Sequence, residues 1–231
     1  MTTTKTKRNN PRPKCFEVRL PASTSNLGPG FDCFGLALKL YLTVRATAVP
    51  DAADPCRVVT TGPKENEALP RNAVNLIYRA MAFATRREGV SLPPVDLRVH
   101  NEIPLASGLG SSAAAIVAGI KLGVLITGLE ISDQSILSYA TEFEGHPDNV
   151  AASLFGGFVA SCTCHDSSVV SAKFAWPTQI RVVIVSPHSQ LPTHVARAAL
   201  PRTVSRQDAV HRRLLRIWQM TTPTPGKRDF R

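Results

Sequence analysis

A short segment rich in glycine and serine constrains the fold of this chain more than any other feature. It runs Pro-Leu-Ala-Ser-Gly-Leu-Gly-Ser-Ser-Ala-Ala-Ala from Pro104 to Ala115. An alternating strand pattern, Val95 to Val99, precedes it, and apolar residues at spacings of three and four follow it, as in a helix. Glycine lets a backbone approach an anion closely, and the start of a helix offers unpaired N–H groups and a positive dipole. The segment therefore predicts a phosphate-binding loop, where Ser111 and Ser112 can bind a phosphate-bound Mg²⁺.

This loop fits neither of the two common nucleotide-binding motifs. A Walker P-loop needs a lysine directly after its last glycine, and none follows Gly110. The dinucleotide fingerprint needs a third glycine where Ala113 stands. A turn that only caps a buried helix stays open as the alternative to a phosphate site.

A second stretch, Glu142 to Val150, places three carboxylates, an imidazole and an amide close together at a predicted helix end. Gly145 and Pro147 end that helix, and Asp148 and Asn149 are followed at once by apolar residues, so we expect them at the edge of a packed element. A carboxylate in such a place can hold a substrate ammonium, and one on the preceding helix can complete a Mg²⁺ shell begun by the serine loop. A well-solvated turn is the alternative.

Length and composition indicate a globular protein of one large domain or two small ones, because the chain has 231 residues and 43% of them are hydrophobic. No apolar run approaches about eighteen residues, and the polar N-terminus lacks the apolar region of a signal peptide, so we expect a soluble cytoplasmic protein with no membrane partner. Five cysteines without a repeated CxxC spacing argue against a disulfide framework. We interpret Cys162, Cys164 and His165 as ordinary strand residues rather than as a metal cluster.

The net charge of +10 comes mostly from the two ends of the chain. Met1 to Lys14 holds five Lys or Arg residues among Thr, Asn and Pro. We interpret this stretch as a solvated tail rather than an RNA-binding arm, and expect no nucleic-acid partner.

Strand and helix patterns alternate along the rest of the chain, which indicates α/β or α+β layering. At Val182 to Ser186, four consecutive apolar residues predict a strand that is covered on both faces. The other expected strands lie at 16–20, 34–42, 57–61, 95–99 and 158–162, and the expected helices lie near 74–81, 115–124, 132–143 and 149–155.

Three segments of the sequence together resemble the GHMP small-molecule kinases. Pro104 to Ala114 is similar to the phosphate-loop motif of that family, Pro-x-x-x-Gly-Leu-Gly-Ser-Ser-Ala. Pro21 to Asp32 and Glu144 to Ala151 resemble two further motifs in the form that the homoserine-phosphorylating members carry. The match extends to Leu191-Pro192-Thr193 and Ala196-Arg197, so the resemblance covers about Phe16 to Ala209.

The resemblance implies ATP-dependent phosphorylation of the side-chain hydroxyl of L-homoserine, giving O-phospho-L-homoserine for threonine biosynthesis, with ATP and Mg²⁺ as cofactors. The implied fold class is α+β, a GHMP-kinase two-domain fold with an N-terminal ribosomal-protein-S5-domain-2-like domain and a truncated ferredoxin-like C-terminal domain. The implied divisions are a basic disordered tail at 1–15, an ATP-binding domain at 16–175 and an incomplete C-terminal domain at 176–231. A homodimer is left open.

The resemblance also implies the roles of individual residues. The implied ATP-binding residues are Pro104, Leu105, Ala106, Ser107, Gly108, Leu109, Gly110, Ser111, Ser112, Ala113 and Asn75. The implied substrate-binding residues are Asn26, Asp32, His146, Asp148, Asn149, Thr193 and Arg197. The implied catalytic residues are Asp148, Arg197 and Glu142, and the implied Mg²⁺ ligands are Ser112 and Glu142, with Glu144 as the alternative carboxylate.

One motif of the family is missing from this sequence. Family members carry a third glycine-rich motif of the Ser-Gly-Ser-Gly-Pro type, and the residues from His211 onward do not contain it. We therefore expect weak ATP binding and greatly reduced catalysis by these 231 residues alone. Two other functions stay open, which are a non-catalytic ligand-binding remnant and a GHMP kinase that acts on another small alcohol.

Overall fold

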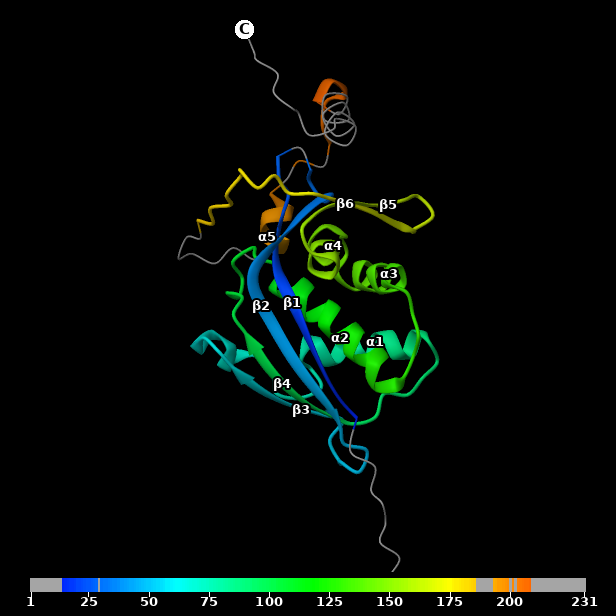
Figure 1. Ribbon diagram of the computed structural model, residues 1–231. Coiled ribbons are helices and arrows are strands. Elements are labelled where there is room, and N and C mark those ends of the chain that lie inside the picture. The colour runs from blue at the N-terminus through cyan, green and yellow to red at the C-terminus, as the bar shows by residue number, and fades with distance from the viewer. Residues whose placement is uncertain (1–13, 29, 186–192, 200, 202, 209–231) are drawn as a thin grey trace, which may run out of the picture.

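The computed structural model describes residues 14–28, 30–185, 193–199, 201 and 203–208 (Figure 1). Nearly all of the predicted basic tail, and most of the predicted C-terminal domain, lie outside these residues.

One mixed sheet of six strands organises the described part of the chain, and the long strand β2 stands at its centre. Strands β3, β4, β2, β5 and β6 are hydrogen-bonded in that order, and β1 pairs with β2. All pairs are antiparallel except β3 with β4. The strands are β1 (Cys15–Ser25), β2 (Phe34–Ala48), β3 (Cys56–Thr61), β4 (Val95–Asn101), β5 (Phe158–Thr163) and β6 (Val169–Phe174).

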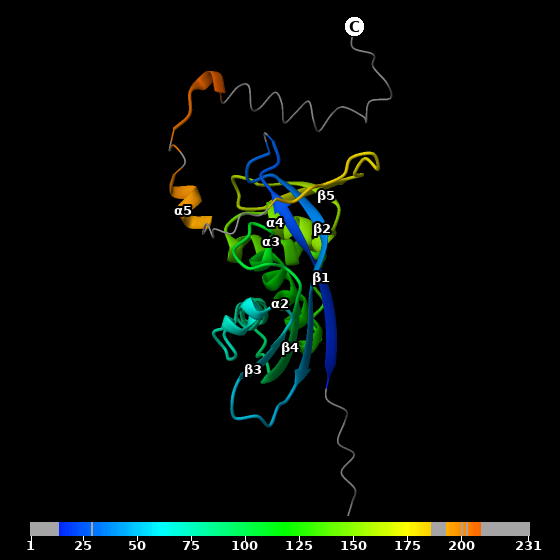
Figure 2. The ribbon, with the colours of Figure 1, turned by 90° about the vertical axis from the view of Figure 1, so that its left-hand side faces the viewer.

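Helices α1 to α4 cover one face of this sheet, and both ribbon views show α2, α3 and α4 on the same side of β1 and β2 (Figures 1 and 2). The helices are the 3₁₀ turn η1 (Lys64–Ala68), α1 (Leu76–Arg87), α2 (Ser111–Thr127), α3 (Asp133–Glu144), α4 (Asp148–Phe155) and α5 (Thr193–Ala198). The sequence therefore predicted the α+β character and each strand and helix of the sheet and its helical cover, apart from β6 and η1.

Strand β4 shows why one face of the sheet is covered and the other is not. Val95, Leu97 and Val99 are buried, whereas Arg98 and His100, which alternate with them along the strand, are exposed. Successive side chains of a strand point to opposite faces, so the apolar set packs on the helices while the polar set faces solvent.

Helix α2 is the central element of the helical layer, and most of its side chains are buried. Its contact with α1 is close because Gly119 has no side chain. A Cβ there would lie 2.3 Å from the carbonyl oxygen of Ile77 and 2.7 Å from the Cβ of Ala80. This close packing holds the start of α1 against the middle of α2, and residues from the start of each helix line the same cavity.

The prediction of a buried strand at Val182 to Ser186 is wrong for Val182 to Val185. Residues 181–185 have no regular structure, and Val183 and Val185 are 82% and 87% exposed. The sheet of the described residues stops at β6, so no partner strand covers the apolar run. Ser186 lies outside the described residues.

None of the helices in the described residues has the length and apolar character that a membrane span requires.

Candidate active site

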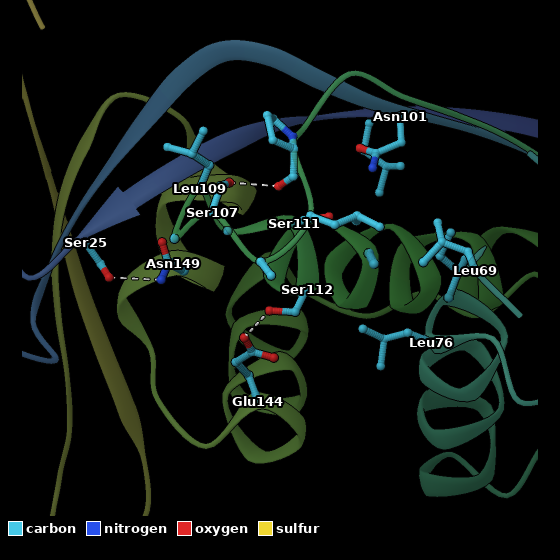
Figure 3. Close-up of a pocket in the computed structure, with 18 of the residues that line it drawn as sticks. Ser25, Leu69, Leu76, Asn101, Ser107, Leu109, Ser111, Ser112, Glu144 and Asn149 are labelled. Atoms are coloured by element: carbon cyan, nitrogen blue, oxygen red, sulfur yellow. Dashed lines mark hydrogen bonds between the residues drawn. The ribbon is translucent and has the colours of Figure 1, made fainter. Parts of the chain in front are cut away.

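A cavity of about 1190 Å³ opens at the start of α2. Its walls come from the end of β1, the start of α1, the loop between β4 and α2, and the turn between α3 and α4 (Figure 3). Ala196 of α5 also lines it. Five segments that are far apart in the sequence therefore meet at one place.

The loop Pro104 to Ser112, here called the phosphate loop, forms one side of this cavity, and all nine of its residues line it. Asn101 anchors the start of the loop, because its buried side chain both accepts from and donates to the backbone of Ile103, each at 3.0 Å. Inside the loop, the Ser107 hydroxyl donates to the carbonyl oxygen of Pro104 at 2.8 Å. These local bonds hold the loop in shape without any ligand.

Gly110 ends the loop in a conformation that suits only glycine. Its φ of +67° is left-handed, and a Cβ would lie 2.1 Å from the Ser23 hydroxyl oxygen and 3.1 Å from the Ser23 carbonyl oxygen. Gly110 is also the N-cap of α2, so the loop approaches β1 closely at the point where the helix begins.

The start of α2 is open to an anion. The Ala114 N–H makes the first helical bond to Gly110, and among the described residues no side chain caps the helix. The N–H groups of the first turn and the positive end of the helix dipole are thus available at the cavity. The phosphate site stays a prediction, and this uncapped helix start supports it.

Ser112 and Glu144 meet beside this helix start. The Ser112 hydroxyl donates to Glu144 Oε1 at 2.6 Å, and both residues line the cavity (Figure 3). A hydroxyl and a carboxylate are the hard oxygen ligands that Mg²⁺ prefers, and two oxygens this close can bind one ion. The donor set therefore fits the predicted magnesium, which Ser112 and Glu144 would hold.

The structure does not bring Glu142 to the serine, which corrects the predicted metal pair. Glu142 is exposed and does not line the cavity, and Arg87 Nη1 of α1 donates to both of its carboxylate oxygens at 2.8 and 2.7 Å. Residues that are two positions apart in an α-helix lie about 200° apart around its axis. Glu142 and Glu144 of α3 therefore point in nearly opposite directions. The alternative carboxylate, Glu144, is the one that the fold places at Ser112.

Asp148 also differs from its predicted role, because it lies under the cavity wall rather than in it. Its side chain is 0% exposed and does not line the cavity. Its Oδ1 accepts from His146 Nδ1 at 2.7 Å and from the backbone N–H of Asn149 at 2.6 Å. Burial raises the pKa of Asp148, but the hydrogen bond and charge of His146, with the Asn149 N–H and the Ser25 hydroxyl, bring the pKa below its ordinary value. Asp148 thus holds His146, which does line the cavity.

Of the remaining predicted substrate residues, only some line the cavity. Asn26 and Asn149 line the cavity, but Asp32 does not. The backbone N–H of Asp32 donates to Asn26 Oδ1 at 2.9 Å, so this residue shapes the loop that carries Asn26. Thr193 and Arg197 belong to α5, and their side chains lie outside the described part of the structure.

The end of the cavity away from the Ser112–Glu144 pair is apolar. Leu69, Val74 and Ile77 line it together with Asn75, the N-cap of α1. The Asn75 side chain accepts from the Ile77 N–H at 3.0 Å and donates to the carbonyl oxygen of Pro70 at 2.8 Å. An apolar slot beside an anion site is a suitable place for a flat heteroaromatic ring.

One predicted ATP-binding residue does not line the cavity, and several lining residues were not predicted. Ala113, predicted to bind ATP, is fully buried in α2 and does not line the cavity, whereas Ala115 does. The lining residues that were not predicted include Ser25, Leu69 and Val74. Ser25 lies within the matched N-terminal motif, so that motif was the available signal, while nothing in the sequence marks Leu69 as a cavity residue.

A family model described as the GHMP kinases N terminal domain matches residues 75–157. These residues carry α1, β4, the phosphate loop and helices α2 to α4, which include most of the cavity wall.

Curated relatives and solved structures are similar over much more of the chain. A homoserine kinase of Deinococcus radiodurans is 43% identical over 196 residues, which are 85% of this chain and 62% of the relative. A solved structure from Listeria monocytogenes that is ascribed to a homoserine kinase is 31% identical, with a TM-score of 0.70 over 90% of this chain and 67% of its own. A homoserine kinase structure from Cytophaga hutchinsonii is 25% identical, with a TM-score of 0.70 over 91% of this chain and 66% of its own. The chain thus spans a little under two thirds of the curated relative's length.

Proposed function

The chain belongs to the GHMP kinase family, and from this premise we propose that it carries the ATP site and much of the substrate site of a homoserine kinase. In this proposal the γ-phosphate of ATP passes to the side-chain hydroxyl of L-homoserine, which gives O-phospho-L-homoserine and ADP. The enzyme acts in the cytoplasm on a small molecule.

One observation carries the proposal, which is the Ser112–Glu144 pair at 2.6 Å beside the uncapped start of α2. Phosphoryl transfer needs alignment and neutralisation of charge more than covalent chemistry. A helix start and a hydroxyl–carboxylate pair supply these requirements at one point. The pair would hold a Mg²⁺ ion, which when bound neutralises charge on the transferring phosphate.

The other walls of the cavity fit the phosphates and adenine of ATP on one side and homoserine on the other. The phosphate loop and the N–H groups of the first turn of α2 bind the phosphates through hydrogen bonds. The apolar end, with Leu69 and Val74, binds the adenine and excludes water from it. The ring of His146 and the side chains of Asn26 and Asn149 face the other side of the phosphate loop, where they bind and orient the polar groups of homoserine.

Asp148 acts indirectly in this proposal. A carboxylate only accepts hydrogen bonds, so His146 Nδ1 must carry the proton between them. Asp148 thereby fixes the orientation of a ring that lines the cavity. Because Asp148 is buried, it does not accept the proton of the substrate hydroxyl. A loose transition state makes such a general base optional.

The test is a turnover assay on the purified chain with ATP, Mg²⁺ and L-homoserine, which follows ADP and identifies the phosphorylated product by ³¹P NMR. L-Serine, one methylene shorter, is the matched control substrate. ADP release that depends on homoserine and is at least about tenfold faster than with serine supports the proposal. A chain that binds a non-hydrolysable ATP analogue and homoserine but forms no product contradicts it and supports the non-catalytic ligand-binding alternative. Equal rates with both alcohols contradict homoserine as the substrate.

A further inference from the structure

We propose that Ser23 is a positioning residue that couples the phosphate loop to the turn 144–150, here called the substrate turn. The proposal rests on the proposed function and deepens it, because it names the device that relates the two halves of the site. Ser23 lies on β1, is 0% exposed, and does not line the cavity itself.

Ser23 contacts the substrate turn through its hydroxyl. The hydroxyl lies 2.9 Å from Asn149 Oδ1 and 3.2 Å from the Asn149 carbonyl oxygen, and it donates its one hydrogen to these acceptors. This contact fixes the orientation of the amide. With Oδ1 turned to Ser23, the Asn149 Nδ2 group donates to the Ser25 hydroxyl at 2.9 Å (Figure 3).

Ser23 contacts the phosphate loop through its backbone N–H and through the space that its hydroxyl oxygen occupies. Its N–H donates to the carbonyl oxygen of Leu109 at 3.1 Å, next to the N-cap of α2. Its hydroxyl oxygen occupies the space into which a Cβ of Gly110 would project, at 2.1 Å. A displacement of the loop at Gly110 therefore pushes on the same oxygen that holds Asn149.

The two contacts of Ser23 place it between the phosphate loop and the substrate turn, and both of these segments line the cavity. Leu109 and Gly110 belong to the phosphate side, and Ser25 and Asn149 to the substrate side. Packed interiors transmit displacements because they have few voids. Nucleotide bound at the loop thus favours the orientation of Asn149 that binds homoserine, and the coupling is reciprocal by linkage.

Ser153 offers a matched control on the same two elements. It lies on α4, is 1% exposed, and its hydroxyl donates to the Pro21 carbonyl oxygen of β1 at 3.1 Å. It therefore joins the same strand to the same helix through one buried hydroxyl, but the partner of that hydroxyl, Pro21, belongs neither to the phosphate loop nor to the cavity wall. Both variants lose a buried hydrogen bond, so a general loss of packing affects them alike.

The first measurement needs no ligand and uses the full chain. Hydrogen exchange by mass spectrometry is compared for Ser23→Ala and Ser153→Ala in peptides that cover the phosphate loop and the substrate turn. We expect Ser23→Ala to speed exchange in both segments, by up to about tenfold, and Ser153→Ala to leave the phosphate loop unchanged. Unchanged exchange of the phosphate loop in Ser23→Ala overturns the proposal.

The second measurement is calorimetry of L-homoserine binding with and without a saturating non-hydrolysable ATP analogue and Mg²⁺. We expect the analogue to tighten homoserine binding in the unaltered chain and in Ser153→Ala, and this gain to fall by about threefold or more in Ser23→Ala. A gain that Ser23→Ala retains in full, or an unaltered chain that binds both ligands without any gain, overturns the coupling. If the unaltered chain binds neither ligand, the proposed function fails, and the exchange result alone decides whether Ser23 joins the two segments.

Discussion

Replacement of Gly110 by alanine tests how tightly the phosphate loop is fitted against β1. The variant carries two separable costs. An alanine at the left-handed φ of +67° costs about 1–2 kcal/mol. Its Cβ would also lie 2.1 Å from the Ser23 hydroxyl oxygen, which is fully buried and has little room to move. Forcing an atom into such a site costs typically about 1–3 kcal/mol. We therefore expect Gly110→Ala to lower the free energy of unfolding in urea by about 2–5 kcal/mol.

Gly128 supplies the control, because it caps the other end of the same helix with nearly the same backbone. Its φ is +75°, and the nearest atom to an added Cβ is Lys14 Nζ at 3.9 Å. Gly128→Ala thus carries only the conformational cost of about 1–2 kcal/mol. If the two variants lose the same free energy of unfolding within about 0.5 kcal/mol, the close contact between the loop and β1 is refuted.

Three further predictions concern stability and reactivity. Because the pKa of Asp148 is lowered in the folded state, its ionised carboxylate stabilises the fold above the unfolded-state pKa of about 3.9, and this stabilisation is lost as pH falls through the folded-state pKa. Asp148→Asn should therefore weaken the acid-side pH dependence of the free energy of unfolding in urea. Met81→Ala should lower the free energy of unfolding by about 2–5 kcal/mol in the same urea assay because Met81 is fully buried, whereas Val59→Ala on the exposed sheet face should change it by less than about 0.5 kcal/mol. Iodoacetamide should label exposed Cys162 quickly and Cys56 only on unfolding, since burial, helped by the charge of Asp96, raises the pKa of Cys56 to about 12, and peptide mass spectrometry reads both rates.

The phosphate loop could be predicted from the sequence because its signal is local. Two glycines at Gly108 and Gly110, a preceding strand and a following apolar helix specify backbone geometry within a dozen residues. The structure has positive φ at both glycines and an uncapped helix start directly after them. No distant contact was needed to recognise this arrangement.

The orientation of the acidic residues was harder to predict because it depends on the rotation of two helices. Leu137 and Ala140 of α3 are buried, and Glu144 lies seven and four residues after them, on the same face. Glu142 falls on the opposite face. The same rule applies to Asp148, which shares the buried face of α4 with Ala151 and Ala152. The helical period was therefore the unused signal that favours Glu144 as the cavity carboxylate and Asp148 as an interior residue.

The apolar run Val182 to Val185 shows the limit of burial predictions from composition. Its residues are apolar enough for a core strand, but burial also needs a covering element. Within the described residues, the sheet offers no strand beyond β6 to pair with it. The apolar end of the cavity was missed for a related reason, since Leu69 and Val74 lie in the segment between η1 and α1 and meet the phosphate loop only in the folded chain.

The most direct test of the central claim is Mg²⁺-dependent binding of a non-hydrolysable ATP analogue, measured by calorimetry for the unaltered chain, Glu144→Gln and Glu142→Gln. The proposal predicts that Mg²⁺ tightens nucleotide binding in the unaltered chain and in Glu142→Gln, whose exposed ion pair with Arg87 contributes at most about 1 kcal/mol to stability. In Glu144→Gln the Mg²⁺ effect should fall by about tenfold or more. Loss of the effect in Glu142→Gln with retention in Glu144→Gln would contradict a magnesium site at Ser112 and Glu144, and the absence of nucleotide binding in the unaltered chain would contradict a triphosphate site at the start of α2.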